Sequence, residues 1–86
     1  MFRTVALAGA FSLALATGAL AVTGEFNNMC AEGLALHKEI KTDCSVNTVY
    51  KGKTYCFGSD QAKQDFMKDP AANLAKAEQF YSKKQG

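Results

Sequence analysis

The clearest pattern of apolar and polar positions lies in the middle of the chain. Two segments rich in β-branched and aromatic residues, 46–50 and 54–57, flank a short Lys-Gly-Lys connection. Such a connection is typical of a β-hairpin, because glycine adopts the positive φ that a tight turn requires. Side chains alternate along a strand, so Tyr55 and Phe57 should share one face and Cys56 should lie on the other. The pattern therefore predicts a hairpin with an aromatic core face.

Two helices are predicted after the hairpin. Ser59 or Asp60 can cap the first helix, which should end near Lys68. Asp69-Pro70 predicts a second start, because proline at the first helical position loses no hydrogen bond. The second helix has apolar positions at the helical period, namely Leu74, Ala77 and Tyr81. The predicted fold class is α+β: a small single domain with a β-hairpin followed by two short helices and an N-terminal segment packed on it.

Residues 1–21 are predicted to be a cleavable signal peptide. Arg3 precedes an apolar run at 5–16, and Ala19-Leu20-Ala21 is a small-x-small cleavage site. A membrane anchor is the competing interpretation, since residues 5–22 carry no charge. The run is rich in Ala and Gly, however, and no basic cluster follows it. We therefore expect a periplasmic protein that begins at Val22 and has no stable membrane insertion.

The mature chain divides at about residue 42. Residues 22–42 are predicted to be an N-terminal segment, with a frayed lead-in at 22–28 and a short helix or a loop at 29–36. A brief extended piece at 39–42 should then lead into the hairpin–helix–helix domain at 43–84. Gly33 interrupts the apolar stretch, which is why this segment is the least defined part of the pattern.

Charge and size narrow the function classes. Without the leader, nine lysines face eight carboxylates, so the net charge is 9 − 8 = +1 and gives no electrostatic footprint for nucleic acid. The 65 remaining residues can bury only a small hydrophobic core. A domain of this size commonly needs a disulfide or a metal, in addition to packing, to be stable. The three cysteines are the residues that could provide this additional stabilisation.

The stretch from Tyr50 to Ser59 resembles the signature of the YHS domain family: a tyrosine, a Gly-Lys turn, Tyr-x-Phe, a small residue and a serine, followed here by Phe66 and Asp69-Pro70. The resemblance covers residues 43–74. It implies a small α+β module similar to treble-clef and TRASH-like metal-binding domains, often found in proteins that handle copper or other heavy metals. The core of the motif consists of Tyr50, Tyr55, Phe57, Phe66 and Pro70.

Metal-binding relatives carry two cysteines at the positions that Gly58 and Ala62 occupy here. A metal would therefore need other ligands. The candidates for one copper or zinc ion are Cys30, Cys44, Cys56 and His37, because thiolates and imidazole suit Zn²⁺ and thiolates suit Cu(I).

The competing hypothesis for the cysteines is a disulfide formed in the oxidising compartment. Cys30 and Cys44 are the predicted pair, and Cys44 is expected to be shared between the metal and disulfide arrangements. Inert buried thiols are a third interpretation. The spacing of the cysteines contains no C-x-x-C pair, so only the fold could bring them together, and a thiol oxidoreductase is disfavoured.

The chain is predicted not to be an enzyme. Asp43, next to Cys44, is interpreted as a turn former and not as part of a Cys–His–Asp site, because the domain is too small for an obvious substrate cleft. The predicted function is binding or trafficking of copper or zinc, with a metal-handling or other envelope protein as partner. The alternative is a disulfide-stabilised, metal-free interaction or accessory module of an envelope protein.

Overall fold

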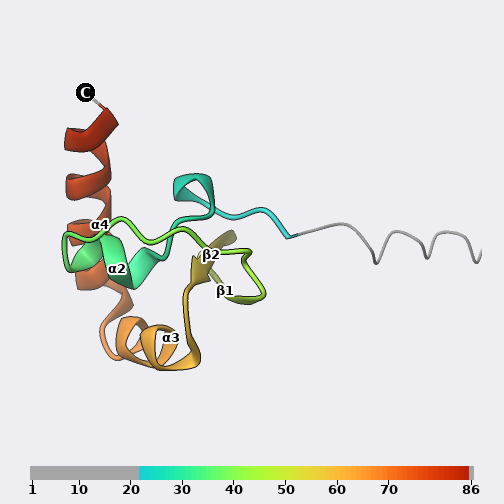
Figure 1. Cartoon of the computed structure of the whole chain (residues 1–86). Coiled ribbons are helices and arrows are strands. Elements are labelled where there is room, and N and C mark those ends of the chain that lie inside the picture. The colour runs from blue at the N-terminus through green and yellow to red at the C-terminus, as the bar shows by residue number, and fades with distance from the viewer. Residues whose placement is uncertain (1–21, 86) are drawn as a thin grey trace, which may run out of the picture.

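The computed structural model describes residues 22–85, and the predicted signal peptide at 1–21 lies outside this range. A two-stranded antiparallel sheet and three helices make an α+β fold, as predicted (Figure 1). No helix within 22–85 is long and apolar enough to cross a membrane. In chain order the elements are the short 3-10 turn η1 (Phe26–Asn28), α2 (Ala31–Ala35), β1 (Val46–Tyr50), β2 (Lys53–Phe57), α3 (Asp60–Met67) and α4 (Pro70–Gln85).

The predicted hairpin is confirmed, with β2 beginning one residue earlier than expected. The register runs from the Val46–Phe57 pair to the Tyr50–Lys53 pair, which leaves two residues in the turn. Gly52 has a φ of 81° and the lysine before it a φ of 51°. Positive φ at both central positions matches the right-handed twist of the flanking strands, so the turn itself fixes the register.

The aromatic face of β2 packs on the helices to form the first core cluster. Tyr55, Phe57 and Phe66 are buried, and the rings of Phe57 and Phe66 lie 5.3 Å apart between centroids. Cys30 and Ala31 complete the buried set. The partly buried residues around it include Val46, Tyr50, Ala62 and Leu74. The predicted aromatic core face of the hairpin is therefore confirmed, and Phe66 packs on it.

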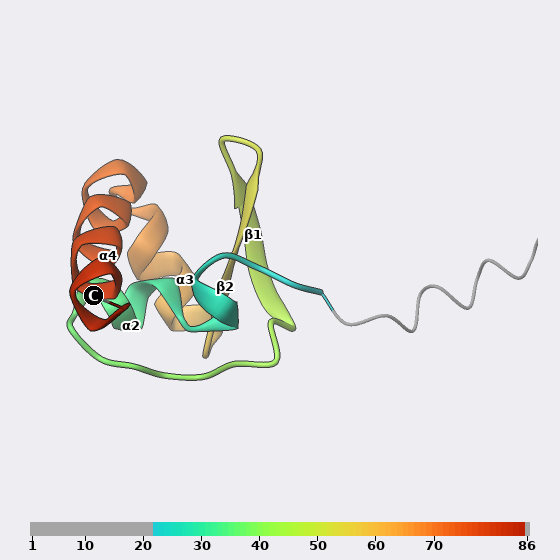
Figure 2. The ribbon, with the colours of Figure 1, turned by 90° about the horizontal axis from the view of Figure 1, so that it is seen from above.

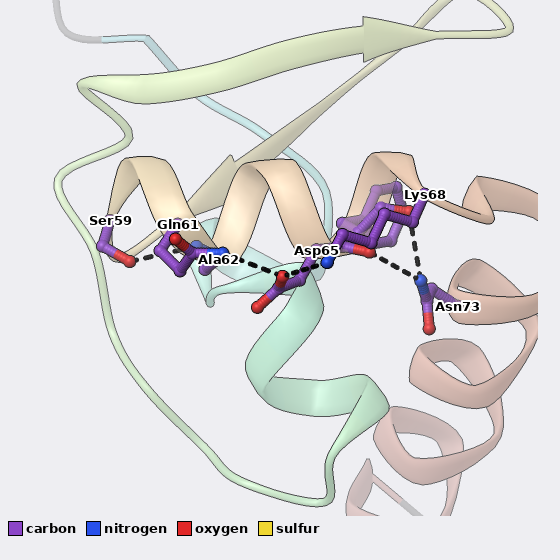
Figure 3. A network of polar contacts seen from close by, with 7 residues as sticks. Ser59, Gln61, Ala62, Asp65, Lys68 and Asn73 are labelled. Carbon is purple, nitrogen blue, oxygen red and sulfur yellow. Dashed lines mark hydrogen bonds and ion pairs between the residues drawn. The ribbon is translucent and has the colours of Figure 1, made fainter.

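Side-chain hydrogen bonds define the ends of α3 (Figure 3). Ser59 Oγ accepts a hydrogen bond from the backbone N–H of Ala62 at 3.1 Å and so caps the helix. At the other end, Asn73 Nδ2 donates to the carbonyl oxygens of Asp65 and Phe66, at 3.3 and 3.1 Å. Carbonyls in the last turn of a helix lack the partners that a continuing helix would provide, so Asn73 fastens α4 to the end of α3.

The start of α4 follows the Asp-Pro signal. Asp69 Oδ1 accepts from the N–H of Ala72 at 3.3 Å, and Pro70 is the first helical residue. Ala77 is fully buried against Leu34 of α2 in a second core cluster, which Phe80 and Tyr81 also contact. The small alanine lets α2 and α4 approach closely, and this is the most extensive contact between helices.

The N-terminal segment differs from the predicted frayed lead-in. Phe26 packs between two tyrosines, with centroid distances of 5.9 Å to Tyr55 and 5.2 Å to Tyr81. All five residues of α2 are buried, and Lys41 pairs with Met29 in an isolated antiparallel bridge. The N-terminal segment therefore packs on the domain, as predicted, through Cys30, α2 and Phe26. A short polar lead-in carries no periodic signal, which is why the sequence pattern did not show that residues 25–28 are ordered around Phe26.

We expect Phe66→Ala to lower the free energy of unfolding by about 3–5 kcal/mol, because the ring is fully buried between β2 and the helices. Urea or thermal unfolding followed by circular dichroism measures the loss. Gln64→Ala, at an exposed position of the same helix, is the matched control and should change little. A midpoint that hardly moves in Phe66→Ala would place the ring outside the core.

Candidate functional site

Two of the three cysteines, Cys44 and Cys56, form a disulfide with a Cα–Cα distance of 4.7 Å. The predicted Cys30–Cys44 pairing is therefore wrong. The hairpin explains the difference, because its register places Asn47 opposite Cys56. Asn47 Nδ2 donates to the carbonyl of Cys44 at 2.7 Å, and Cys44 has a left-handed φ of 63°. The chain thus turns back over β2 just before β1, and both half-cystines are fully buried.

Cys30 keeps a free thiol, also buried. Its backbone pairs with Cys56 in an isolated parallel bridge, and its N–H donates to the carbonyl of Ile40 at 2.8 Å. The sulfur accepts a hydrogen bond from the N–H of Gly33 at 3.3 Å, so Cys30 caps the start of α2. Cys44 was expected to be the cysteine common to both arrangements. Instead Cys56 has both neighbours: its sulfur is bonded to Cys44, and its backbone pairs with that of Cys30.

His37 is held against α4. Its ring stacks on that of Phe80 with the centroids 5.0 Å apart and the planes 8° from parallel. The backbone of His37 has a φ of 63°, which turns the chain at the end of α2. In the part of the chain that the structure describes, no three His, Cys, Asp or Glu side chains are placed to hold a metal ion. The four candidate ligands are thus divided between a disulfide, a helix cap and an aromatic stack.

A segment that the sequence pattern did not single out covers the disulfide. Gly24 lies directly over it: a Cβ atom there would overlap Cys56 Sγ and lie 3.3 Å from Cys44 Sγ. The N–H of Gly24 donates to Asn28 Oδ1 at 2.6 Å, and that oxygen is 3.6 Å from Cys56 Sγ. Gly24 and the Asn27-Asn28 pair were the available signal, since glycine permits a close approach and both residue types adopt left-handed backbone.

Glu32 is an ionisable residue that is buried among the helices. It is 8% exposed on α2, and its Oε1 atom is buried without a hydrogen-bond partner. Burial raises the pKa of Glu32, and the charge of Asp65 on α3 raises it further, while Lys76 on α4 lowers it. The carboxyl therefore holds its proton more tightly in the folded domain than in the unfolded chain.

Asp43 is the turn former that the sequence suggested. Its Oδ1 accepts from the N–H of Ser45 at 2.9 Å, and hydrogen bonding from Ser45 lowers the pKa of Asp43. The side chain is exposed. Its contribution to stability is present above its unfolded pKa and is lost as the pH falls, which is opposite in sign to that of Glu32.

The two surface hollows on α3 and α4 do not reach the cysteines, His37 or Glu32. Two shallow hollows lie on the outer faces of the helices, one lined by Asp60, Lys63, Gln64 and Met67 of α3, the other by Ala75, Glu78, Gln79, Ser82 and Lys83 of α4. Neither lining contains a cysteine, His37 or Glu32.

Comparisons with family models, curated proteins and solved structures found no match to the chain.

We expect Cys44→Ser to lower the free energy of unfolding by about 3 kcal/mol, the value for opening a loop of about a dozen residues. Urea unfolding in the absence of reductant measures it. The control is the same titration with a dithiol reductant, which should bring the native chain to the level of the variant and leave the variant unchanged. A variant as stable as the oxidised native chain would show that this bridge does not support the fold.

We expect Glu32→Gln to raise stability at neutral pH and to flatten its pH dependence. The neutral carboxyl's contribution is fully present below the unfolded pKa and is lost as the pH rises through the raised folded pKa, so the native chain should weaken in that window. Unfolding free energies from pH 4 to 8 measure this. Glu78→Gln, on the exposed face of α4, is the control. Parallel curves for native and Glu32→Gln proteins would contradict the prediction.

Proposed function

We propose that the chain is an exported, non-enzymatic YHS-type module that binds an envelope protein in the periplasm, with its disulfide stabilising the fold. The observation that carries this is the Cys44–Cys56 bridge. It uses two of the four candidate metal ligands to hold the strand that carries the aromatic core. The leader-like segment and the YHS-like residue pattern support export and family, and the order of hairpin, helix and helix agrees with that pattern.

The hairpin is the surface best placed to meet a partner. Its turn extends away from the connection between α2 and β1 (Figure 2). Val49 is 65% exposed, the largest exposed fraction among the large apolar side chains described. Within residues 22–85, β1 pairs only with β2, so its outer backbone edge is open for an added strand. Lys51 and Lys53 at the turn favour an extended partner segment with acidic side chains.

A second candidate function is copper or zinc binding by the reduced protein. One observation favours it: Cys56 is bonded to Cys44, and its backbone pairs with that of Cys30, so the three residues are neighbours at β2. Reduction would free two thiols there for a thiophilic ion, and the thiol of Cys30 would have to leave the cap of α2 to become a third ligand. His37 would have to leave its stack on Phe80 to join them.

A photo-crosslinking residue at position 49 of the exported chain tests the proposed interaction. We expect a defined adduct with one envelope protein, lost when an acidic residue replaces Lys51 and Lys53. The same residue at position 64, exposed on α3, is the matched control and should give no such adduct. Equal labelling at both positions would remove the hairpin as the binding surface.

Metal and thiol analysis of the same material separates the two candidate functions. Protein purified without reductant should contain one thiol that reacts in denaturant, from Cys30, and no copper or zinc. Three reactive thiols together with a stoichiometric metal ion would support metal binding instead.

A further inference from the structure

The cover over the disulfide consists of residues 24–28, which we call the latch. Gly24 lies so close to both sulfurs that a side chain at this position would overlap Cys56 Sγ. Cys44 and Cys56 are both fully buried. A thiolate must approach a disulfide sulfur directly to attack it, so the bridge is closed to an external thiol while the latch is in place.

The latch is held firmly at Asn28, whose carbonyl accepts from the N–H and the hydroxyl of Thr42 at 3.2 and 2.6 Å, and by fewer contacts at its N-terminal end. Its backbone makes one hydrogen bond to β2, from the N–H of Glu25 to the carbonyl of Thr54 at 2.8 Å. Asn28 Oδ1 accepts the N–H of Gly24 at 2.6 Å. The ring of Phe26 is the apolar anchor, and it is only partly buried. Since neither Gly24 nor Glu25 buries an apolar side chain, this end of the latch can lift off the bridge while Phe26 stays packed in the core.

The latch is also strained. Phe26, Asn27 and Asn28 have φ values of 59°, 56° and 65°, three successive left-handed residues of which none is glycine. Left-handed backbone is unfavourable for residues with a Cβ atom, and least so for asparagine. Cys44 on the other side of the bridge is left-handed too, with a φ of 63°. A wider opening that also releases Phe26 relieves the first strain, and cleavage of the bridge relieves the second.

We propose that the latch gates thiol–disulfide exchange at Cys44–Cys56 and that the bridge is a redox-responsive clasp. The inference rests on the disulfide and not on the proposed partner. When the latch opens, a thiolate of an external dithiol attacks Cys56 Sγ, the sulfur that Gly24 covers most closely, and Cys44 leaves as a thiolate that takes up a proton. The second thiol of the reagent then displaces Cys56, so the dithiol becomes a disulfide and both cysteines become thiols.

Reduction releases one end of the connection between α2 and β1. This connection, residues 36–45, ends at the bridge and runs around the outside of the domain before it reaches β1 (Figure 2). Cys44 can then adopt a negative φ, and the hydrogen bond from Asn47 to its carbonyl no longer has a fixed acceptor. The redox state of the bridge therefore sets the order of this connection and of the base of the hairpin.

The test is the rate at which dithiothreitol reduces the bridge in the native protein, measured with increasing urea below the unfolding transition. Opening of a five-residue latch exposes little surface, so the rate should depend weakly on urea. Gly24→Ala should increase the rate about tenfold or more, equivalent to about 1.4 kcal/mol of opening free energy, because the new methyl group overlaps Cys56 Sγ. Asn28→Ala, which removes the acceptor for Gly24, should also increase it.

Gly58→Ala is the matched control. Its added methyl group meets Ile40 at 3.5 Å, an ordinary contact, and lies outside the latch, so the reduction rate should stay at the native value. Circular dichroism and urea unfolding establish that each variant is folded. The proposal is overturned if the urea dependence of reduction equals that of global unfolding, or if Gly24→Ala and Asn28→Ala fold and are reduced no faster than the native chain.

Discussion

Strand β2 is buried on both faces, and the rest of the structure depends on how each face is covered. Tyr55 and Phe57 face the helices, while Cys56 faces the N-terminal segment and Cys44. An isolated two-stranded hairpin is marginally stable in water, so it needs a layer on at least one side. Here α2, α3 and α4 supply one layer, and a disulfide beneath a short peptide supplies the other.

The N-terminal half of the domain serves both layers. α2 is buried between the hairpin and α4, and Phe26 joins the two core clusters. The connection from α2 to β1 is fastened to α4 by the His37–Phe80 stack and by an ion pair of 3.2 Å between Lys84 and Glu39. Because the ion pair is exposed, it contributes little to stability. The disulfide is the stronger restraint on this connection.

The redox state of the Cys44–Cys56 bridge distinguishes the two proposed functions. In the oxidised domain the disulfide supports the hairpin that would meet a partner. In the reduced domain the same two sulfurs become thiols, and the backbone of Cys30 pairs with that of Cys56 beside them. The latch stands between these states. Because Gly24 and Glu25 bury no apolar side chain, the controlling step is local opening at this end of the latch and not unfolding of the core.

The order of hairpin, helix and helix was predictable because its signals are local. The turn glycine, the Ser59 cap and the Asp69-Pro70 start each act within four residues, and the alternation in β2 separated Cys56 from the aromatic face. Burial of Ala77 followed from the periodicity of the helix that carries it. The sequence by itself left the cysteine pairing open, and the predicted Cys30–Cys44 pair was wrong. A disulfide depends on where two distant Cβ atoms meet, and left-handed backbone at Cys44 decided this by turning the chain back over β2.

The same holds for Gly24, His37 and Glu32, whose neighbours come from other elements. Local propensity and period determined the elements of this protein. Only the tertiary structure decided which sulfurs, rings and charges those elements bring together, because these contacts join residues that no local pattern connects.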